Sequence, residues 1–582
     1  MASFAALVTL RKWDRDREFL PWVIVVCSVT VAFFLMMSIV FENPFARLYQ
    51  TLDGISPHTF APASSTIFTP ADGRGLNPLL RHPGMIIHPP MLYLGFVAFV
   101  IPYAFAMAAL ITGRTDDRWI RITRRWTLWA WLFLSFGLVL GGRWAYDVLG
   151  WGGYWGWDPV EISALMPWLT GTAFLHSVMI QEKRGLLKQW NMLLIILTYA
   201  LVIFGTFLTR SGVLSSVHAF ASSPIGPFFM GFVSLTLIAS IGLLIYRWPD
   251  LRSETEMKSM LSREALFLLN NLLFMSVLVV CFIGVIYPLV SELMTGQKVT
   301  VGPPYYQRAT APLFASLMLL MGIAPLSAWG HSTLLTLGRA LWKSALVALG
   351  IVAVIFFTYT QNIIALVGFY LVAFVLIVTL VEFWRATRAR QKTQQENFFM
   401  ALYHLMGRNR RRYGGYIIHI SMMLMAIGIL GINLFQQQTQ GTVPLNGALK
   451  VGEYTVQYDS IAVFPGPDAR QVTRAVVTVY KNGQPISELY PRIDYYPDAQ
   501  QTMTIPGLRS TPQDDLYIIL VDWQPASDIG ATFKIYVNPL VNWLWIGSLL
   551  FIVGIFIAAW PNKEDAELVP ARNPAYQPSS AD

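Results

Sequence analysis

Long apolar runs alternate with short polar linkers over most of the 582 residues of the chain. A helix that crosses a bilayer needs about 20 predominantly apolar residues, and about twelve stretches of the sequence meet this requirement. They are residues 19–41, 85–111, 126–142, 162–181, 190–209, 227–246, 266–291, 312–330, 341–358, 362–384, 414–435 and 540–560. The pattern predicts an all-α polytopic membrane protein with about twelve transmembrane helices.

One long linker, residues 436–539, has a different pattern, because apolar and polar residues alternate in it with the period of a β-strand. The segments are "YTVQYDSIAVF", "AVVTVYKNGQPISELY", "LYIILVDW" and "ATFKIYV", and the Asn-Gly in the second is typical of a hairpin turn. We therefore expect a transmembrane core over 1–435, a β-rich domain over 436–539 and the last transmembrane helix over 540–560. Residues 561–582 are expected to form a polar cytoplasmic tail.

Basic residues gather in alternate linkers, which predicts the orientation of the chain. The clusters are Arg11 with Lys12, Arg15 and Arg17, then residues 114–125, 183–188, 247–263 and 385–412. By the positive-inside rule these linkers face the cytoplasm. The linkers 42–84, 143–161, 210–226, 292–311 and 436–539 are then extracytoplasmic. The sequence thus predicts a multi-pass protein of the bacterial cytoplasmic (inner) membrane with a periplasmic β-rich domain.

Composition narrows the function further. The chain is 55% hydrophobic and only 13% charged, which is far more apolar than a soluble domain. Its net charge of +9 is explained by the basic linkers, so a nucleic-acid partner is not favoured. Cys27 and Cys281 lie far apart in apolar runs without a C-x-x-C motif, so the chain is neither a thiol oxidoreductase nor a c-type cytochrome. We also expect no signal peptide, because no cleavage site precedes the first charged cluster.

The stretch "GGRWAYDVLGWGGYWGWDPVE", residues 141–161, combines aromatic residues with glycines in an outer linker. Asp158, Pro159 and Glu161 fit the cap, first and third positions of a helix with a capping box, so the two acids are predicted to be structural. Aromatic residues also gather at membrane interfaces. Here, however, their density and the intervening glycines favour a platform for a planar apolar molecule. The aromatic residues are Trp144, Tyr146, Trp151, Tyr154, Trp155 and Trp157.

The predicted topology sorts four of the eight histidines into two pairs. His88 and His218 lie on the outer face, and His176 and His419 lie at one depth near the cytoplasmic side, given a rise of about 1.5 Å per residue. Such histidines can be satisfied polar groups in a span or solvated loop residues, but ionisable groups in spans often mark function. Two axial imidazoles are a usual way to hold haem iron. Zinc is less suitable, because no carboxylate or cysteine is available in the spans to complete a tetrahedral site.

The four remaining histidines lie in linkers without matching companions, and we interpret them as surface residues. They are His58, His82, His331 and His404.

The aromatic segment and the stretches around the paired histidines resemble those of a known family. "WGGYWGWDPVE" is similar to the tryptophan-rich signature of the haem-handling proteins CcmC, CcsA and CcmF of cytochrome c maturation. "GLNPLLRHPGMIIHPPMLYLG", "GTFLTRSGVLSSVHAFASSP" and the late span that carries His419 resemble CcmF, the haem lyase subunit family, from about residue 40 to residue 560. Two departures are that family members usually begin with additional spans, and that Arg143 and Gly156 stand where other residues are common in the family.

The resemblance implies roles for the two histidine pairs. It implies that His88 and His218 ligate haem that arrives on the chaperone CcmE, and that His176 and His419 hold a resident haem b in the membrane. The platform residues are then Trp144, Trp151, Tyr154, Trp155 and Trp157. Arg143 and Arg210 are candidate partners of haem propionates, although Arg210 fits an interfacial anchor equally well.

The resemblance also implies a reaction and partners. The vinyl groups of the transferred haem are attached to the two thiols of a C-x-x-C-H motif in apocytochrome c, with thiol-reducing partners such as CcmH and CcmG. Electrons from quinol are expected to reduce the haem iron. No residue of the chain is assigned as a catalytic acid or base.

Two other function classes remain open at this point. A transporter that exports haem predicts inverted repeats or broken helices that meet at the membrane midplane, and the sequence indicates neither. A non-catalytic scaffold that assembles the maturation factors predicts that all four histidines are dispensable.

Overall fold

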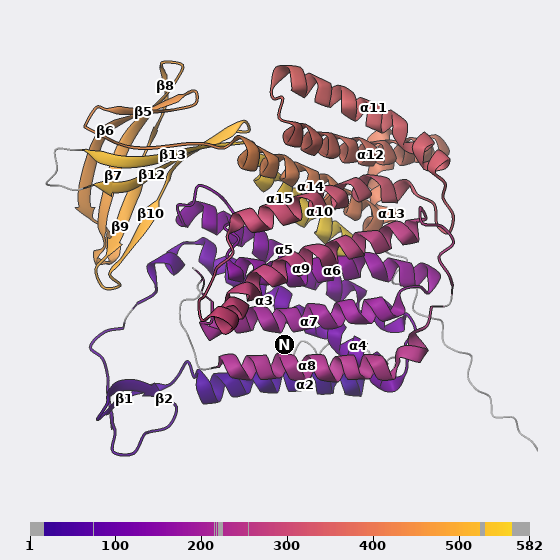
Figure 1. The fold of residues 1–582 in the computed structure, drawn as a ribbon, viewed down its shortest axis with the longest axis horizontal. Helices are drawn as coiled ribbons and strands as arrows, with labels where there is room; N and C mark the ends of the chain where they lie inside the picture. The colour runs from indigo at the N-terminus through magenta and orange to yellow at the C-terminus, as the bar shows by residue number, and fades with distance from the viewer. Residues whose placement is uncertain are drawn as a thin grey trace, which may run out of the picture.

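The computed structural model describes residues 17–73, 75–214, 216, 218, 225–253, 255–523 and 530–560. Long helices run side by side in a bundle, and a β-sandwich stands beyond one end of it (Figure 1). The residues of the first basic cluster up to Arg15 and the expected tail, 561–582, lie outside the described residues.

The helices account for most of the chain. The first half of the bundle consists of α2 (Leu20–Met36), α3 (Gly84–Ala98), α4 (Val100–Thr112), α5 (Arg118–Val148), α6 (Pro159–Arg184) and α7 (Lys188–Ser211). The second half consists of α8 (Gly226–Tyr246), α9 (Arg263–Thr295), α10 (Pro303–Ile323), α11 (Leu334–Thr358), α12 (Ile363–Gln394), α13 (Phe398–Arg408), α14 (Arg410–Phe435) and α15 (Val541–Ala559).

The prediction of a polytopic helical membrane protein is confirmed. Over the described residues, 11 helical spans are long and apolar enough to cross a membrane, with α3 and α4 forming one of them. The count is one below the expected number because α6 is not apolar enough. That helix nevertheless packs against α7 and α9 inside the bundle, where the hydroxyl groups of its buried Ser163 and Thr170 donate to backbone carbonyls instead of facing lipid.

Two predicted helix boundaries are wrong in ways that bear on function. The helix expected over 126–142 is α5, which continues to Val148, so Arg143, Trp144 and Tyr146 lie on its last turns and not in a loop. The helix expected over 312–330 is α10, which begins at Pro303, because proline suits the first turn of a helix.

The predicted β-rich domain before the last helix is confirmed as a sandwich of two antiparallel sheets. The six-stranded sheet contains β5 (Ala448–Val451), β6 (Tyr454–Pro465), β7 (Gln471–Lys481), β8 (Gln484–Leu489), β9 (Arg492–Tyr496) and β10 (Gln501–Ile505). The four-stranded sheet contains β4 (Gln437–Val443), β11 (Gly507–Ser510), β12 (Asp514–Trp523) and β13 (Ala531–Pro539). Asn482 and Gly483 both have positive φ angles between β7 and β8, as the predicted hairpin turn requires.

A third, smaller sheet was not predicted. It consists of β1 (Arg47–Thr51), β2 (Gly54–His58) and β3 (Thr66–Ile67), and it lies at the same end of the bundle as the sandwich (Figure 1). Its strands are short and lack a clear alternation of apolar and polar residues, so the sequence gives little signal for them.

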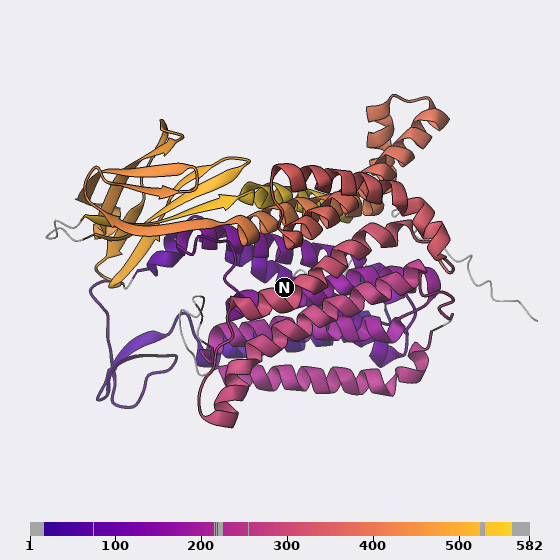
Figure 2. The same cartoon turned by 45° about the horizontal axis from the view of Figure 1, so that its top comes forward.

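The sandwich is joined to the bundle through two helices. α14 leads into β4 and β13 leads into α15, and β4 and β13 are neighbours in one sheet (Figure 2). α14 and α15 approach closely at glycines, since a Cβ atom at Gly428 or Gly547 would lie 2.6 or 2.7 Å from a backbone nitrogen of the other helix. The two attachments and the close helix packing fix the position of the sandwich over the end of the bundle at which α5 ends and α6 begins, the end that the sequence analysis predicts to be the outer one.

Candidate functional site

His88 is held inside the outer end of the bundle. It lies in α3 and is 9% exposed, and its Nδ1 is 2.8 Å from the carbonyl oxygen of Gly137 in α5. A carbonyl only accepts, so Nδ1 carries the hydrogen and the lone pair of the neutral ring is on Nε2. Gly141 lies against the same ring, where a Cβ atom would be 2.6 Å from Cε1. The backbone of α5 therefore determines both the position and the tautomer of His88.

His218 is oriented by a carboxylate. Its Nδ1 lies 3.0 Å from Oδ2 of Asp158, which also accepts hydrogen bonds from the Ser216 hydroxyl at 2.6 Å and the Val160 N–H at 3.0 Å. Burial by itself raises the pKa of Asp158, but the interactions with His218, Ser216 and Val160 outweigh it and hold this pKa below the usual value. Asp158 is thus ionised, and Nε2 of His218 carries the lone pair.

Both outer histidines lie against the last turns of α5. The ring of His88 lies against Gly141, three residues before Trp144. The ring centroids of Trp144 and His218 are 5.8 Å apart, and Trp144 is 1% exposed. Three elements therefore converge here: α3, the last turns of α5 and the linker after α7.

Part of the aromatic segment packs against the β-sandwich. The Tyr146 hydroxyl donates to Asp515 at 3.1 Å, and the Tyr517 hydroxyl donates to the carbonyl of Tyr146 at 2.9 Å. Gly152 has a positive φ, and a Cβ atom there would lie 2.6 Å from the ring of Tyr536. Two platform candidates share this environment, because Trp151 packs in a cluster with residues of β9 and β10, and Tyr154 contacts Trp545 edge-on.

The remaining part packs against the helices. Trp155 lies perpendicular to Trp157 at a centroid distance of 6.0 Å. Trp157 stacks on Tyr306 of α10 at 5.0 Å with parallel rings. Among the platform candidates, Trp144 is thus the one with a ring contact to a histidine of the outer pair, and a haem contact for the five residues stays a prediction.

The capping box at the start of α6 is confirmed. The Asp158 side chain caps the helix, and Oε2 of Glu161 accepts hydrogen bonds from the backbone N–H groups of Asp158 and Gly156. The sequence analysis assigned Asp158 this structural role alone. Its contact with His218 was missed because the two residues are 60 positions apart.

The two arginines proposed for haem propionates lie in different surroundings. Nε and Nη2 of Arg143 contact the two carboxylate oxygens of Asp147 at 3.0 and 2.9 Å, and the guanidinium lies over the Trp545 ring. Arg210 is exposed in the last turn of α7. Asp147 already occupies the bidentate face of Arg143, so a role for either arginine with haem stays a prediction.

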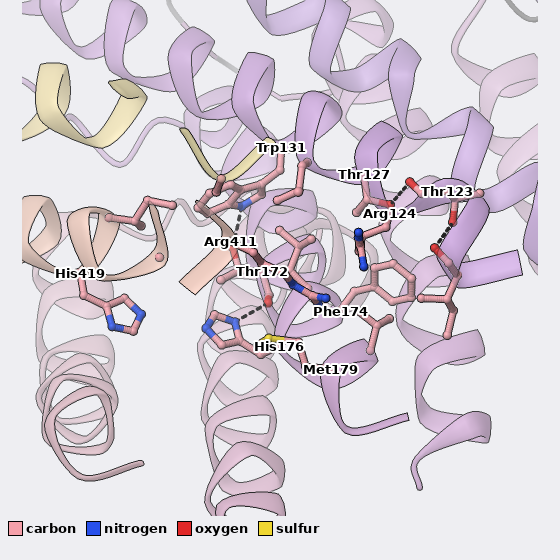
Figure 3. Close-up of a pocket in the computed structure, with 17 residues that line it drawn as sticks. Thr123, Arg124, Thr127, Trp131, Thr172, Phe174, His176, Met179, Arg411 and His419 are labelled. Atoms are coloured by element: carbon pink, nitrogen blue, oxygen red, sulfur yellow. Dashed lines mark hydrogen bonds between the residues drawn. The ribbon is translucent and has the colours of Figure 1, made fainter. Parts of the chain in front are cut away.

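His176 and His419 line one cavity inside the bundle, at the predicted common depth (Figure 3). Nδ1 of His176, in α6, is 2.8 Å from the Thr172 carbonyl, so its Nε2 carries the lone pair. Nδ1 of His419, in α14, is buried without a hydrogen-bond partner. Trp131 is a wall of the cavity, and its Nε1–H donates to Thr172 at 2.9 Å.

These features fit a haem held by two histidines. His176 has a fixed tautomer with a free lone pair on Nε2. His419 has a buried Nδ1 that, among the described residues, has no hydrogen-bond partner, and a purely structural role for this histidine does not explain that. Within the described ranges, no group of three or more His, Cys, Asp or Glu side chains could hold a metal ion, so the remaining ligands of a metal here must come with it, as in a porphyrin. The cavity measures about 120 Å³, below the roughly 300 Å³ of small ligand pockets, so its walls must separate to admit the ring.

The other four histidines are placed outside both pairs. His331 and His404 are exposed, as expected. His58 and His82 are half-buried and make local hydrogen bonds, with Ser56 and with the N–H of Gly84, so their interpretation as plain surface residues is only partly right.

Comparison with known proteins finds relatives over most of the chain. A family described as "Cytochrome C assembly protein" matches residues 1–215, and "CcmF C-terminal beta-sandwich" matches residues 434–539. The cytochrome c-type biogenesis protein CcmF of Pseudomonas aeruginosa is 36% identical over 90% of this chain and 76% of its own length. CcmF of Haemophilus influenzae is 31% identical over 95% of this chain and 82% of its own length. A solved structure, "Cytochrome c Heme Lyase CcmF", matches with a TM-score of 0.74 and 28% identity, over 96% of this chain and 81% of that one.

The helical bundle, the sandwich and the tryptophan-rich segment thus define a multi-pass membrane protein of cytochrome c assembly. Within that class the chain belongs to the CcmF family.

Proposed function

We propose that this chain, a haem lyase subunit of the cytochrome c maturation system, receives its haem substrate at His88 and His218 and holds a second haem at His176 and His419. One observation carries the proposal. Three of the four histidines have Nδ1 fixed by an acceptor, which leaves Nε2 free as a ligand: Gly137 for His88, Asp158 for His218 and Thr172 for His176.

At the outer site the chain binds and orients its substrate. The Asp158 carboxylate strengthens His218 as an iron ligand, and Trp144 supplies a rigid aromatic face beside it. The bound haem is then positioned for addition of two cysteine thiols of apocytochrome c across its vinyl groups, with each thiol hydrogen going to vinyl carbon. The chain contributes mainly proximity and orientation to this reaction.

At the inner site His176 and His419 would hold a resident haem b. A haem in this position supplies one-electron redox chemistry, and quinol is the proposed electron donor. The residues of the chain hold and shield it: the Thr172 carbonyl orients His176, and Trp131 and Phe174 keep water from the cavity.

The partners and the orientation follow from the same proposal. CcmE delivers haem, and CcmH and CcmG keep the apocytochrome thiols reduced. The chain lies in the bacterial cytoplasmic membrane with the outer histidines and the sandwich on the periplasmic face. Support comes from Arg114, Arg118 and Arg121, which lie before or at the start of α5, at the opposite end of this helix from Trp144.

The visible spectrum of the purified full-length chain in detergent tests the proposal. We expect a reduced b-type spectrum that is lost in His176→Ala and in His419→Ala and is retained in His88→Ala and His218→Ala. His331→Ala, which changes an exposed histidine outside both pairs, is the control. A b-type spectrum that survives both inner substitutions would contradict the inner site.

A further inference from the structure

The cavity between His176 and His419 has a charged end. Most of its walls are apolar, but Arg124 of α5 and Arg411 of α14 also line it (Figure 3). Arg411 precedes His419 by eight residues in α14, and Arg124 precedes Trp131 by seven in α5. At about 1.5 Å per residue these separations are roughly 12 and 10 Å along the helices. Both guanidinium groups therefore belong to the same end of the cavity, away from the outer site.

A carboxylate from a third helix lies between the two arginines. Nη1 of Arg411 donates to Oε2 of Glu182 at 2.8 Å, whereas Nη1 of Arg124 lies 3.8 Å from Oε1 of the same carboxylate, beyond hydrogen-bond distance. Glu182 is in α6, six residues after His176. The helix that supplies one histidine thus also supplies the carboxylate between the arginines. The three side chains are 13–33% exposed, so their charges are screened less than those of free surface residues.

At Arg411 the contact with Glu182 leaves capacity for a second anion. A guanidinium group has five N–H donors in a planar fork, and the salt bridge of Arg411 uses Nη1. Planar forks match carboxylates in geometry better than lysine does. The cavity therefore combines an apolar body, two imidazoles and a pair of guanidinium groups at one end. The ligand that matches all three has a planar apolar ring, a metal at its centre and anionic groups along one edge.

We propose that Arg124 and Arg411 bind the two propionate carboxylates of the haem held by His176 and His419. This inference rests on the proposed inner haem site and deepens it. The arginines set the orientation of the ring, with its carboxylate edge toward the linkers that precede α5 and α14 and its vinyl edge toward the interior of the bundle. Glu182 is a positioning residue, because it acts on the ligand through the arginines.

Removal of the negative charge from the ligand tests the proposal without changing the protein. The full-length chain is produced in cells that cannot synthesise haem, purified in detergent and loaded with either haem or haem dimethyl ester. Release to excess apomyoglobin is followed by absorbance. We expect the unsubstituted chain to release the dimethyl ester at least about tenfold faster than haem, since a hydrogen bond to a charged group is lost at each carboxylate.

Substitution of the two arginines tests the same contacts by changing the protein instead of the ligand. Arg124→Gln with Arg411→Gln should speed release of haem by about tenfold or more and abolish the difference between haem and its ester. Arg125→Gln with Arg410→Gln is the matched control, because these neighbouring arginines do not line the cavity. Thermal unfolding of each variant shows whether the fold is retained.

The outcomes separate the two proposals. If the unsubstituted chain binds no haem with a b-type spectrum, the inner site itself is wrong. If it binds haem through His176 and His419 but releases the ester no faster than haem, the inner site stands and the role of the arginines is overturned. This second outcome is measured on the unsubstituted protein, so it does not depend on the folding of any variant.

Discussion

The outer and inner histidine pairs are built from the same side chain but are held in different ways. His88 and His218 come from a helix and a linker, and their partners are a carbonyl of α5 and the ionised carboxylate of Asp158. His176 and His419 lie within continuous helices, and one of them has no hydrogen-bond partner for Nδ1. The outer pair is thus assembled from separate elements and tuned by charge, as suits a ligand that arrives and leaves. The inner pair is enclosed in the bundle, as suits a ligand that stays.

Removal of an outer histidine should have the largest effect on function, and it tests the difference between the two pairs. We expect His88→Ala and His218→Ala to abolish cytochrome c maturation while the b-type spectrum of the inner site is unchanged, because each substitution removes a proposed iron ligand from the outer site alone. Covalent haem staining of a reporter cytochrome measures maturation. Normal maturation in both variants would mean that the outer pair is not a haem site, as the scaffold hypothesis requires.

Replacement of Asp158 by asparagine should have the next largest effect. Asparagine caps a helix about as well as aspartate, so Asp158→Asn keeps the start of α6 while it removes the charge that orients His218. Loss of such a partner weakens a site by about 10–100-fold, and maturation should fall within that range at limiting haem. Asp158→Ala, which also removes the cap, separates the two roles through its additional loss of thermal stability.

The pH dependence of this contact has a defined sign. The pKa of Asp158 is lowered in the folded chain, so its contribution to stability is fully present above the ordinary value of about 4. It is lost as the pH falls through the lowered pKa. Thermal unfolding of Asp158→Asn and of the unsubstituted chain should therefore differ more at neutral pH than in acid, where the difference should shrink.

A substitution at the contact between the aromatic segment and the sandwich should have a smaller effect. Gly152→Ala places a methyl group against the ring of Tyr536 at a residue with positive φ, and we expect it to destabilise this contact by about 1–3 kcal/mol. Hydrogen exchange of β12 and β13 should become faster. Gly153→Ala is the control, because nothing lies within 4 Å of its position for a Cβ atom. Equal exchange in the two variants would contradict the docking role of Gly152.

The smallest expected effect is that of Tyr146→Phe. The substitution removes two hydrogen bonds, one donated to Asp515 and one accepted from Asn538. Asp515 still accepts from Asn542 at 2.7 Å, and Asn538 still donates to the Gly152 carbonyl at 3.1 Å. We expect a loss of about 1–2 kcal/mol in the free energy of unfolding, measured as a reduced midpoint of thermal unfolding. Haem binding at the inner site should not change, since Tyr146 lies at the opposite end of α5 from Arg124.

The parts of this structure that could be predicted from sequence are those that depend on neighbouring residues. The apolar runs predicted the helices, and the alternation of apolar and polar residues predicted β6, β7, β12 and β13. The spacing of Asp158 and Glu161 predicted the capping box. Depth along the helices was enough to bring His176 and His419 together. Contacts across the fold left no local signal. Examples are Asp158 with His218, Glu182 with Arg411, and Gly152 with Tyr536.

The insertion of the sandwich between α14 and α15 also determines the order in which the protein assembles. Ala558, near the end of α15, lines the cavity that contains His419 of α14, yet the sandwich separates these two helices along the chain. α15 reaches its place beside α14 only after the loop of about a hundred residues between them has closed. The wall of the cavity between His176 and His419 is therefore completed after the sandwich segment has been made, and the proposed haem would enter this site late in biogenesis.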